Sequence, residues 1–224
     1  MSTKTARRWE REYARKGIPS SYRTRPSSPV LVGLKAVRAR TFKGLRALDI
    51  GCGRGRNALY LARKGFEAHA MDFAPGLAKE VAARAKKMGL AGRVFPVCRD
   101  VTMPWPYPAR YFDFAADIFC YKHQTGKAAR KKYRAELRRV LKKSAVYVLS
   151  LASTRDGFYG PLPETGNLPR KAGKVVVDPY TGIASALFTR ADVEREFRGK
   201  FRLVKFARKR KRGPMHGKNY ARET

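Results

Sequence analysis

One stretch, from residue 48 to residue 57, decides the fold: Leu48-Asp49-Ile50-Gly51-Cys52-Gly53-Arg54-Gly55-Arg56-Asn57. The short apolar segment that leads into it begins at Leu45 and predicts a β-strand, and residues 56–64 after it predict a helix. The glycines at 51, 53 and 55 let the backbone turn sharply and approach a ligand without obstruction by a Cβ atom. The helix that follows presents unpaired N–H groups at its start. The stretch therefore predicts a strand–turn–helix unit that is suited to hold a ligand.

Three interpretations of this glycine loop compete. A phosphate-binding P-loop ends in Gly-Lys-Ser/Thr, whereas this loop continues as Arg54-Gly55-Arg56-Asn57, so the sequence excludes a P-loop. A dinucleotide fingerprint needs its third glycine at position 56, where Arg56 stands, so the match is weak. The third interpretation is a tight turn without a ligand, and the acidic residues downstream disfavour it.

Outward from the loop, strand-like and helix-like segments alternate. Strands that are separated by helices imply parallel pairing with right-handed crossovers. The chain is therefore expected to have an α/β fold, with a doubly wound, mostly parallel sheet and helices on both faces. The expected strands are 45–50, 67–71, 93–98, 111–119 and 145–151, and the expected helices between them are 56–64, 75–88 and 127–141.

Aspartates stand at or near the carboxyl ends of the first four expected strands, at positions 49, 72, 100 and 117. In doubly wound sheets, ligands bind outside these strand ends. Asp72 follows the loop by roughly twenty residues, the offset at which a carboxylate accepts hydrogen bonds from ribose hydroxyls. Phe73 is placed to lie against an adenine ring. Two alternatives stay open: Asp72 caps the helix that begins near Pro75, and Asp100 caps a turn.

Residues 48–57 strongly resemble motif I of the class I methyltransferases that use S-adenosylmethionine (SAM). Asp72 and Asp100-Val101 match that family in order and spacing, and the resemblance extends from about Leu45 to Leu151. It implies a Rossmann-like methyltransferase fold and SAM as the cofactor. The Gly-Arg-Asn run at 55–57, with the following Ala58-Leu59-Tyr60-Leu61-Ala62, is similar to the tellurite-resistance and small-molecule branch.

The same resemblance implies roles for individual residues. The glycine loop would pack against the methionine portion of SAM, Asp49 would organise its amino end, Asp72 would hold the ribose, and Asp100 with Val101 would contact adenine. The expected cofactor-binding set is Asp49, Gly51, Gly53, Gly55, Asn57, Asp72, Phe73, Asp100, Val101 and Asp117.

Methyl transfer is an in-line displacement that needs alignment of the acceptor, exclusion of water and, where required, removal of a proton. No metal site is expected. The loop after the fourth strand, residues 117–124, supplies Tyr121 to position the acceptor and His123 as a general base or as a hydrogen bonder that orders the loop. Tyr159 opens a Gly- and Pro-rich segment that is expected to form a lid. We therefore expect Tyr121, His123 and Tyr159 to be catalytic.

One domain is expected over residues 1–224, with a basic helical cap (1–44), a SAM-binding core (45–151), a lid (152–188), and a C-terminal helix and strand (189–224). In the cap, Trp9 and Tyr13 share one face of a helix over 3–16, and they either close over the cofactor or simply pack on the core. A second cap helix is expected over 30–40. After a helix over 189–197 and a sixth strand over 201–207, only a short polar segment follows the Gly213-Pro214 break. The resembled family adds a seventh, antiparallel strand there, so the sheet edge is expected to be incomplete.

The composition indicates a globular chain with an unusual charge. The hydrophobic fraction of 43% suffices for a core, while 51 Lys+Arg against 17 Asp+Glu give a formal net charge of +34. Such a charge attracts polyanions, or it simply solvates the surface of a generally basic protein. The densest run, residues 208–212, is either a phosphate-contacting segment or a solvated strand end or hairpin tip. Scattered cysteines, no apolar run near the roughly 20 residues of a membrane span, and a charged N-terminus predict a cytoplasmic protein.

Three functions follow from these observations. The first is a SAM-dependent methyltransferase that acts on a small-molecule acceptor. The second is an RNA methyltransferase, acting on rRNA or tRNA, whose basic surface binds the nucleic acid. The Asn/Asp-Pro-Pro-Tyr/Phe motif typical of methylation at amino nitrogens of bases is missing, which disfavours that particular RNA chemistry. The third is a non-catalytic protein that binds SAM or nucleic acid.

Overall fold

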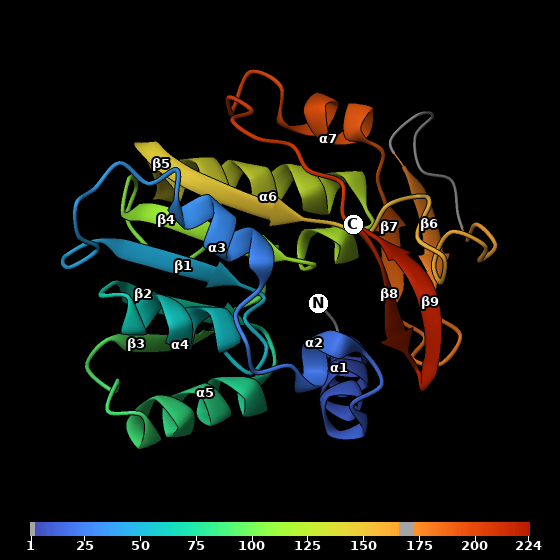
Figure 1. The fold of residues 1–224 in the computed structure, drawn as a ribbon, viewed down its shortest axis with the longest axis horizontal. Helices are drawn as coiled ribbons and strands as arrows, with labels where there is room; N and C mark the ends of the chain where they lie inside the picture. Colours follow the sequence, from blue (N-terminus) through green and yellow to red (C-terminus); the bar gives the residue numbers. More distant parts are fainter. Residues whose placement is uncertain (1–2, 166–172) are drawn as a thin grey trace.

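The structure is a computed structural model and describes residues 3–165 and 173–224. Its centre is a five-stranded sheet in the order β3-β2-β1-β4-β5, and every neighbouring pair is parallel. The doubly wound α/β fold expected from the sequence is confirmed (Figure 1). The strands are β1 (Arg46–Ile50), β2 (Glu67–Asp72), β3 (Val94–Cys98), β4 (Phe112–Ile118) and β5 (Leu141–Ser150).

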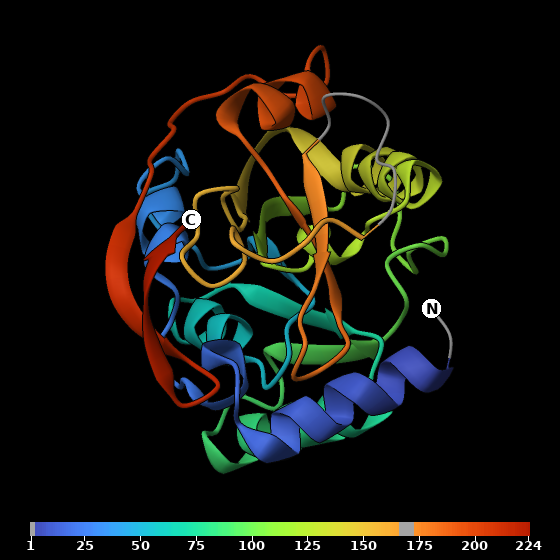
Figure 2. The same cartoon turned by 90° about the vertical axis from the view of Figure 1, so that its right-hand side faces the viewer.

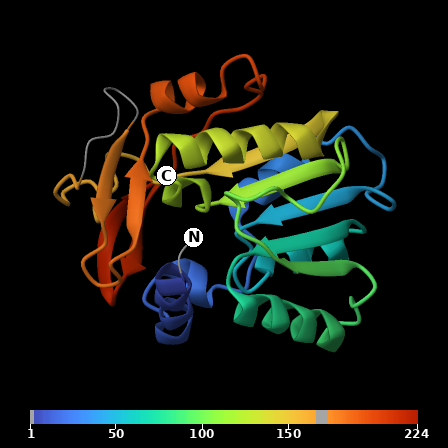
Figure 3. The same ribbon diagram turned by 180° about the vertical axis from the view of Figure 1, so that it is seen from behind.

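Helices cover both faces of this sheet. Figure 1 shows α3 (Ser28–Leu34) and α4 (Arg56–Arg63) on one face, and Figure 3 shows α6 (Lys127–Val140) on the other. Beside α4, α5 (Pro75–Lys87) packs against β2 and β3. One apolar cluster joins the buried residues of α3, α4 and α5 to the sheet, and a second joins those of α6 to it. The sheet is buried on both sides, as its parallel pairing requires.

The start of each crossover helix follows from local sequence. Pro75 stands in the first turn of α5, where its missing N–H is not needed. In α7 (Arg190–Phe197), Thr189 and Asp192 form a reciprocal capping box, so the expected helix over 189–197 is confirmed. The expected helix over 30–40 is wrong at its C-terminal end. There α3 stops at Leu34, because the next N–H groups bond to carbonyls only three residues back.

Beyond the carboxyl ends of the strands lie the cap and two hairpins (Figures 1 and 2). The cap contains α1 (Thr3–Arg15) and the short α2 (Pro19–Tyr22). The first hairpin pairs β6 (Lys174–Val177) with β7 (Ala184–Leu187), and the second pairs β8 (Arg210–Met215) with β9 (Lys218–Glu223). These segments place side chains opposite the sheet edge at which the sequence predicts the ligand.

The C-terminal part corrects two expectations. Residues 201–207 form no strand, because Leu203 and Val204 are 52% and 69% exposed and no neighbouring strand pairs with them. Gly213-Pro214 is no break either, since both residues lie within β8. A two-stranded sheet leaves one edge of each strand open, so the missing N–H of Pro214 is tolerated. The turn is instead at His216-Gly217, where both φ angles are positive.

The β5 edge of the central sheet carries no further strand in the part of the chain that the structure describes. Among the strands of residues 3–165 and 173–224, only β4 pairs with β5. Residues 218–223 do form a strand, but it pairs with β8 and is held against the lid. There the Ser153 hydroxyl donates to Glu223 at 2.8 Å, and Arg222 pairs with Asp156 at 2.8 Å. No helix in the described part of the chain is long and apolar enough to cross a membrane.

Candidate active site

A cavity of about 830 Å³ lies between the carboxyl ends of the sheet strands and the surrounding cap and hairpins. The sheet side contributes the glycine loop and the loops after β2, β3 and β4. Trp9 and Tyr13 of α1, Tyr159 of the lid, and Arg222 of β9 line the remaining wall. The cavity therefore stands where a doubly wound sheet binds its ligands.

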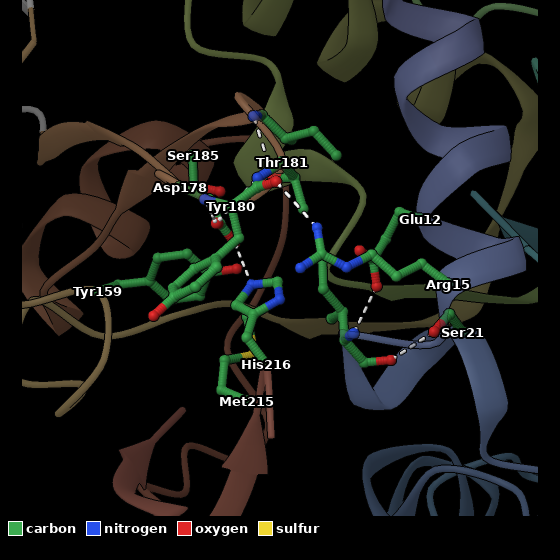
Figure 4. Close-up of polar contacts among 12 residues, drawn as sticks. Glu12, Arg15, Ser21, Tyr159, Asp178, Tyr180, Thr181, Ser185, Met215 and His216 are labelled. Carbon is green, nitrogen blue, oxygen red and sulfur yellow. Dashed lines mark hydrogen bonds and ion pairs between the residues drawn. The ribbon is translucent and has the colours of Figure 1, made fainter. Parts of the chain in front are cut away.

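A set of contacts joins distant segments near this cavity (Figure 4). The His216 Nε2 atom lies 2.8 Å from Asp178 Oδ2, and the His216 ring stacks on Tyr180. Its backbone N–H donates to the Gly17 carbonyl, which follows α1. Arg15 of α1 donates to the Tyr180 carbonyl at 3.3 Å. These contacts join the cap to both hairpins next to the cavity.

The glycine loop approaches its neighbours closely at each glycine. Gly51, with φ of +65°, lines the cavity, and a Cβ atom added to it would lie 2.6 Å from Cys120 Cβ. A Cβ on Gly53 would lie 2.0 Å from the Tyr13 hydroxyl oxygen, and one on Gly55 would lie 2.8 Å from Val81 Cγ2. Of these three glycines, only Gly51 borders the cavity. Gly53 leaves space for Tyr13 of α1, and Gly55 leaves space for Val81 of α5.

Asp72 ends β2 with a buried carboxylate on the cavity wall. Its Oδ2 accepts from the Gly53 N–H at 2.9 Å, and its Oδ1 accepts from the Ala74 N–H at 3.1 Å. Burial raises the pKa of Asp72, and these hydrogen bonds oppose the rise. A carboxylate offers about four acceptor positions, so capacity remains for a ligand hydroxyl. Asp72 thus both orders the helix start and stays available to a ligand.

Asp49 and Asn57 lie beneath the glycine loop. Asp49 accepts from the Ala58 N–H at 3.1 Å and from the Asn57 amide at 3.4 Å, and it does not line the cavity. Asn57 does line the cavity and accepts from the Ser27 N–H at 2.9 Å. Burial raises the pKa of Asp49 to about 6. In this position Asp49 fixes the entry of the loop into α4.

Asp117 has the same relation to the loop after β4. It is fully buried away from the cavity and accepts from the N–H groups of Cys120 and Tyr121, at 2.8 and 2.9 Å, and from the Tyr133 hydroxyl. Burial raises its pKa to about 7, although these hydrogen bonds favour the charged form. Asp117 therefore shapes the loop that carries the expected acceptor residues.

Three further residues of the expected cofactor set line the cavity: Phe73, Asp100 and Val101. The Asp100 Oδ1 accepts from both the N–H and the hydroxyl of Thr102 at 2.8 Å, so this residue does order a turn. With Asp72, these side chains combine acidic acceptors and apolar surface on one side of the cavity. The wall fits an adenosine-like group.

The expected catalytic residues separate into two groups. His123 lines the cavity within the short helix η1 (Tyr121–His123), and Tyr159 faces it from the lid. The His123 Nδ1 lies 2.9 Å from the Ala184 carbonyl, so Nδ1 carries the proton and the Nε2 lone pair is free in the neutral ring. Burial lowers the pKa of His123, and the Lys122 charge lowers it further. Tyr121 is fully buried outside the cavity, and its hydroxyl donates to Glu196 at 2.7 Å.

Of the thirteen residues singled out from the sequence, those on the cavity wall are Gly51, Asn57, Asp72, Phe73, Asp100, Val101, His123 and Tyr159. Those away from it are Asp49, Gly53, Gly55, Asp117 and Tyr121. Sequence reasoning missed Lys122, Ser150 and Arg222, which also line the cavity. Lys122 stands between the two residues that attracted attention, but one basic residue among 51 gives no signal. No group of three or more His, Cys, Asp and Glu side chains in the described residues is placed to hold a metal ion.

Comparison with known proteins finds a family match within the core. Residues 47–144 match the model of a family described as a methyltransferase domain. The matched residues contain the glycine loop, Asp72, Asp100 and the loop after β4, which are the segments on which the expected resemblance rests. A comparison with curated protein sequences finds no match.

Solved structures share the fold at low sequence identity. A SAM-dependent methyltransferase from Methanosarcina mazei has a TM-score of 0.66 at 18% identity, over 85% of this chain and 92% of that one. The Burkholderia thailandensis 1,6-didemethyltoxoflavin-N1-methyltransferase, with its substrate and S-adenosylhomocysteine bound, has a TM-score of 0.62 at 22% identity. That match covers 98% of this chain and 88% of the Burkholderia chain. The chain spans only 48%, 57% and 40% of three other matches: Bacillus subtilis YcgJ, the [4+2]-cyclase SpnF and a methyltransferase from Galdieria sulphuraria.

Proposed function

We propose that this chain is an enzyme that transfers the methyl group of SAM to a small-molecule acceptor. The observation that carries the proposal is a single cavity whose wall contains Asp72 and Phe73 on one side and His123 and Tyr159 beyond β4. Two reactants that share such a space react as if they were one molecule, which lowers the entropic part of the barrier. The Burkholderia relative binds a small substrate together with S-adenosylhomocysteine, which supports the same arrangement here.

The donor side uses the acidic and apolar residues of the strand ends. SAM, when bound, supplies a methyl group on a positively charged sulfur. In the proposal, a free acceptor position of Asp72 receives a ribose hydroxyl, Phe73 and Val101 pack against adenine, and Asp100 accepts from the adenine amino group. Gly51 lies on the cavity wall beside the methionine portion, and its lack of a Cβ atom lets the loop pack against Cys120.

Asp49, Asp117 and Asn57 act by holding the segments around the cavity in place. Asp49 and Asp117 hold the two loops in shape, since both carboxylates are spent on backbone N–H groups of those loops. Asn57 lines the cavity and ties the start of α4 to Ser27. In this proposal Tyr159 and His123 position the acceptor. A catalytic role for Tyr121 stays a prediction, and Tyr121 does not line the cavity.

An RNA acceptor is the second candidate, and one observation favours it. The basic run at 208–212 is exposed along its whole length, and two of its members, Lys209 and Lys211, also line the cavity. A polyanion could therefore follow these side chains to the cavity. The tellurite-resistance-like branch and a cytoplasmic location likewise stay predictions.

Incubation with methyl-labelled SAM and a fractionated cell extract tests the proposal. Label in the low-molecular-weight pool supports a small-molecule acceptor, and label in tRNA or rRNA supports the second candidate. If wild-type protein labels no fraction and also takes up no SAM in equilibrium dialysis, the proposed function is wrong. Label transfer that is lost in Asp72→Ala, but retained in a variant of the exposed Lys64, assigns the activity to this cavity.

A further inference from the structure

Lys122 is a buried amine on the cavity wall whose Nζ contacts a hydroxyl and aromatic rings. The residue is 4% exposed, and its Nζ donates to the Ser185 hydroxyl at 3.1 Å. The same Nζ lies 4.0 Å from the centre of the Tyr159 ring. No carboxylate of the described residues lies within ion-pair distance of it. The Phe119 ring centre lies 5.9 Å from this Nζ. One hydroxyl and two ring faces are weak partners for a buried ammonium ion.

Two other basic side chains, the buried Arg130 and the partly buried Arg222, each have a carboxylate partner. Arg130, which is 1% exposed, pairs with Glu196 at 3.0 Å. Arg222, next to Lys122 in the cavity wall, pairs with Asp156 at 2.8 Å. Because an isolated buried charge costs several kcal/mol, a fold normally supplies such a partner. Lys122 has none among residues 3–165 and 173–224, and it faces the space that the acceptor would enter.

The groups around Lys122 favour its neutral form near physiological pH. Burial lowers the pKa of Lys122 to about 7; the positive charge of Arg222 also lowers it, and the carboxylates of Asp156 and Asp178 oppose the shift. Ser185 of β7, Tyr159 of the lid and the neighbouring His123 complete its surroundings. A base whose pKa lies near the working pH is the most effective in proton transfer. Burial and the Lys122 charge lower the pKa of His123 as well, and its Nδ1 is committed to the Ala184 carbonyl.

We propose that Lys122 receives the proton that the acceptor loses, and that the acceptor is therefore a weak acid methylated on an O–H or N–H group. The proposal rests on the proposed function and names the chemistry of its acceptor. The acceptor oxygen or nitrogen forms a bond to the methyl carbon, the carbon–sulfur bond breaks, and the sulfonium becomes a neutral thioether. The proton moves to the Lys122 Nζ, where Ser185 and the Tyr159 ring stabilise the new ammonium ion. Solvent takes up this proton when the product leaves.

A chromogenic probe tests the proton transfer without knowledge of the natural acceptor. The probe is 4-nitrophenol, a weak O–H acid whose ionised form absorbs at a longer wavelength. It is added to protein saturated with S-adenosylhomocysteine, at a pH below the pKa of the free probe. Wild-type protein and Lys64→Met are expected to show the band of bound phenolate. Lys122→Met should lower this band at least about tenfold, because the base is gone. Equal bands in wild type and Lys122→Met overturn the proposal.

The labelled product gives the second test. The proposal expects the label on oxygen or nitrogen, and label on carbon or sulfur overturns it. Lys122→Met and Lys122→Arg should both reduce turnover about 100-fold or more, because arginine keeps the charge but does not act as a base. SAM affinity should stay within about twofold of wild type in both variants. The wild-type rate should rise with pH through about 7, and the residual rate of Lys122→Met should lack this limb.

These arms separate the two proposals. If wild-type protein fails to bind SAM, the proposed function fails whatever Lys122 does. If SAM binds but Lys122→Met turns over within about threefold of wild type, only the role of Lys122 is wrong. Thermal unfolding of both variants checks that any loss does not come from misfolding.

Discussion

Replacement of Lys122 with methionine is expected to stabilise the folded protein, by an amount that decreases as the pH rises. Methionine fills a similar volume without a charge, so the variant removes a buried ammonium ion that pairs with no carboxylate of residues 3–165 and 173–224. Burial lowers the pKa of Lys122 from the ordinary 10.5 to about 7 in the folded protein. Between these two values the unfolded chain binds one more proton than the folded chain at this residue.

The sign and size follow from that difference in bound protons. Stability rises with pH wherever the unfolded state holds more protons, and a full proton corresponds to about 1.4 kcal/mol for each pH unit. In wild-type protein the penalty from Lys122 is complete below pH 7 and shrinks as the pH rises above 7. The advantage of Lys122→Met should therefore fall by about 3 kcal/mol between pH 6 and pH 9. Contributions that do not depend on pH, such as the lost hydrogen bond to Ser185, cancel in this comparison.

Urea unfolding at several pH values, followed by circular dichroism, measures this difference. Lys64→Met is the matched control, because Lys64 is exposed and lies outside the cavity. Its stability difference from wild type should stay constant over the same range. A constant difference for Lys122→Met as well would refute the argument, because Lys122 would then titrate alike in the folded and unfolded states.

Three further substitutions test other parts of the structure. Gly51→Ala should abolish measurable SAM binding and cost roughly 1–2 kcal/mol of stability from backbone strain alone, since φ is +65° and the new Cβ meets Cys120; calorimetry and urea unfolding measure both effects. Tyr159→Ala should lower turnover more than SAM affinity, because Tyr159 faces the acceptor side; equal losses in activity and in a calorimetric titration would reject that assignment. Thr189→Ala should lower the free energy of unfolding by about 1 kcal/mol, because the capping box with Asp192 is lost, and should leave SAM affinity unchanged. A loss of less than about half that value in thermal unfolding would count against the capping role.

The core could be predicted from sequence because its signals are local. The glycine run at 51–55 and the aspartates after the strands identify strand ends, and the alternation of strand and helix fixes parallel pairing. Each of these signals lies within a few consecutive residues, so the sequence alone reveals the core. The same local features place Asp72, Phe73 and Asp100 on one cavity wall.

The C-terminal part depended on contacts between distant residues, which periodicity does not reveal. The apolar residues Leu203 and Val204 suggested a strand, but no partner strand lies beside them. The last strand is instead held by Ser153 and Asp156, more than sixty positions away. Lys122 was missed for a related reason, since only its burial in the folded protein distinguishes it from the other basic residues.

The most direct test of the account is a calorimetric titration of the protein with SAM, in wild type and in Asp72→Ala. The account predicts one binding site per chain in wild type. It also predicts an affinity at least about tenfold lower in Asp72→Ala, because the carboxylate that orders Gly53 and faces the cavity is removed. Absence of SAM binding in wild type, or equal affinity in both proteins, would contradict the central claim that this cavity holds the methyl donor.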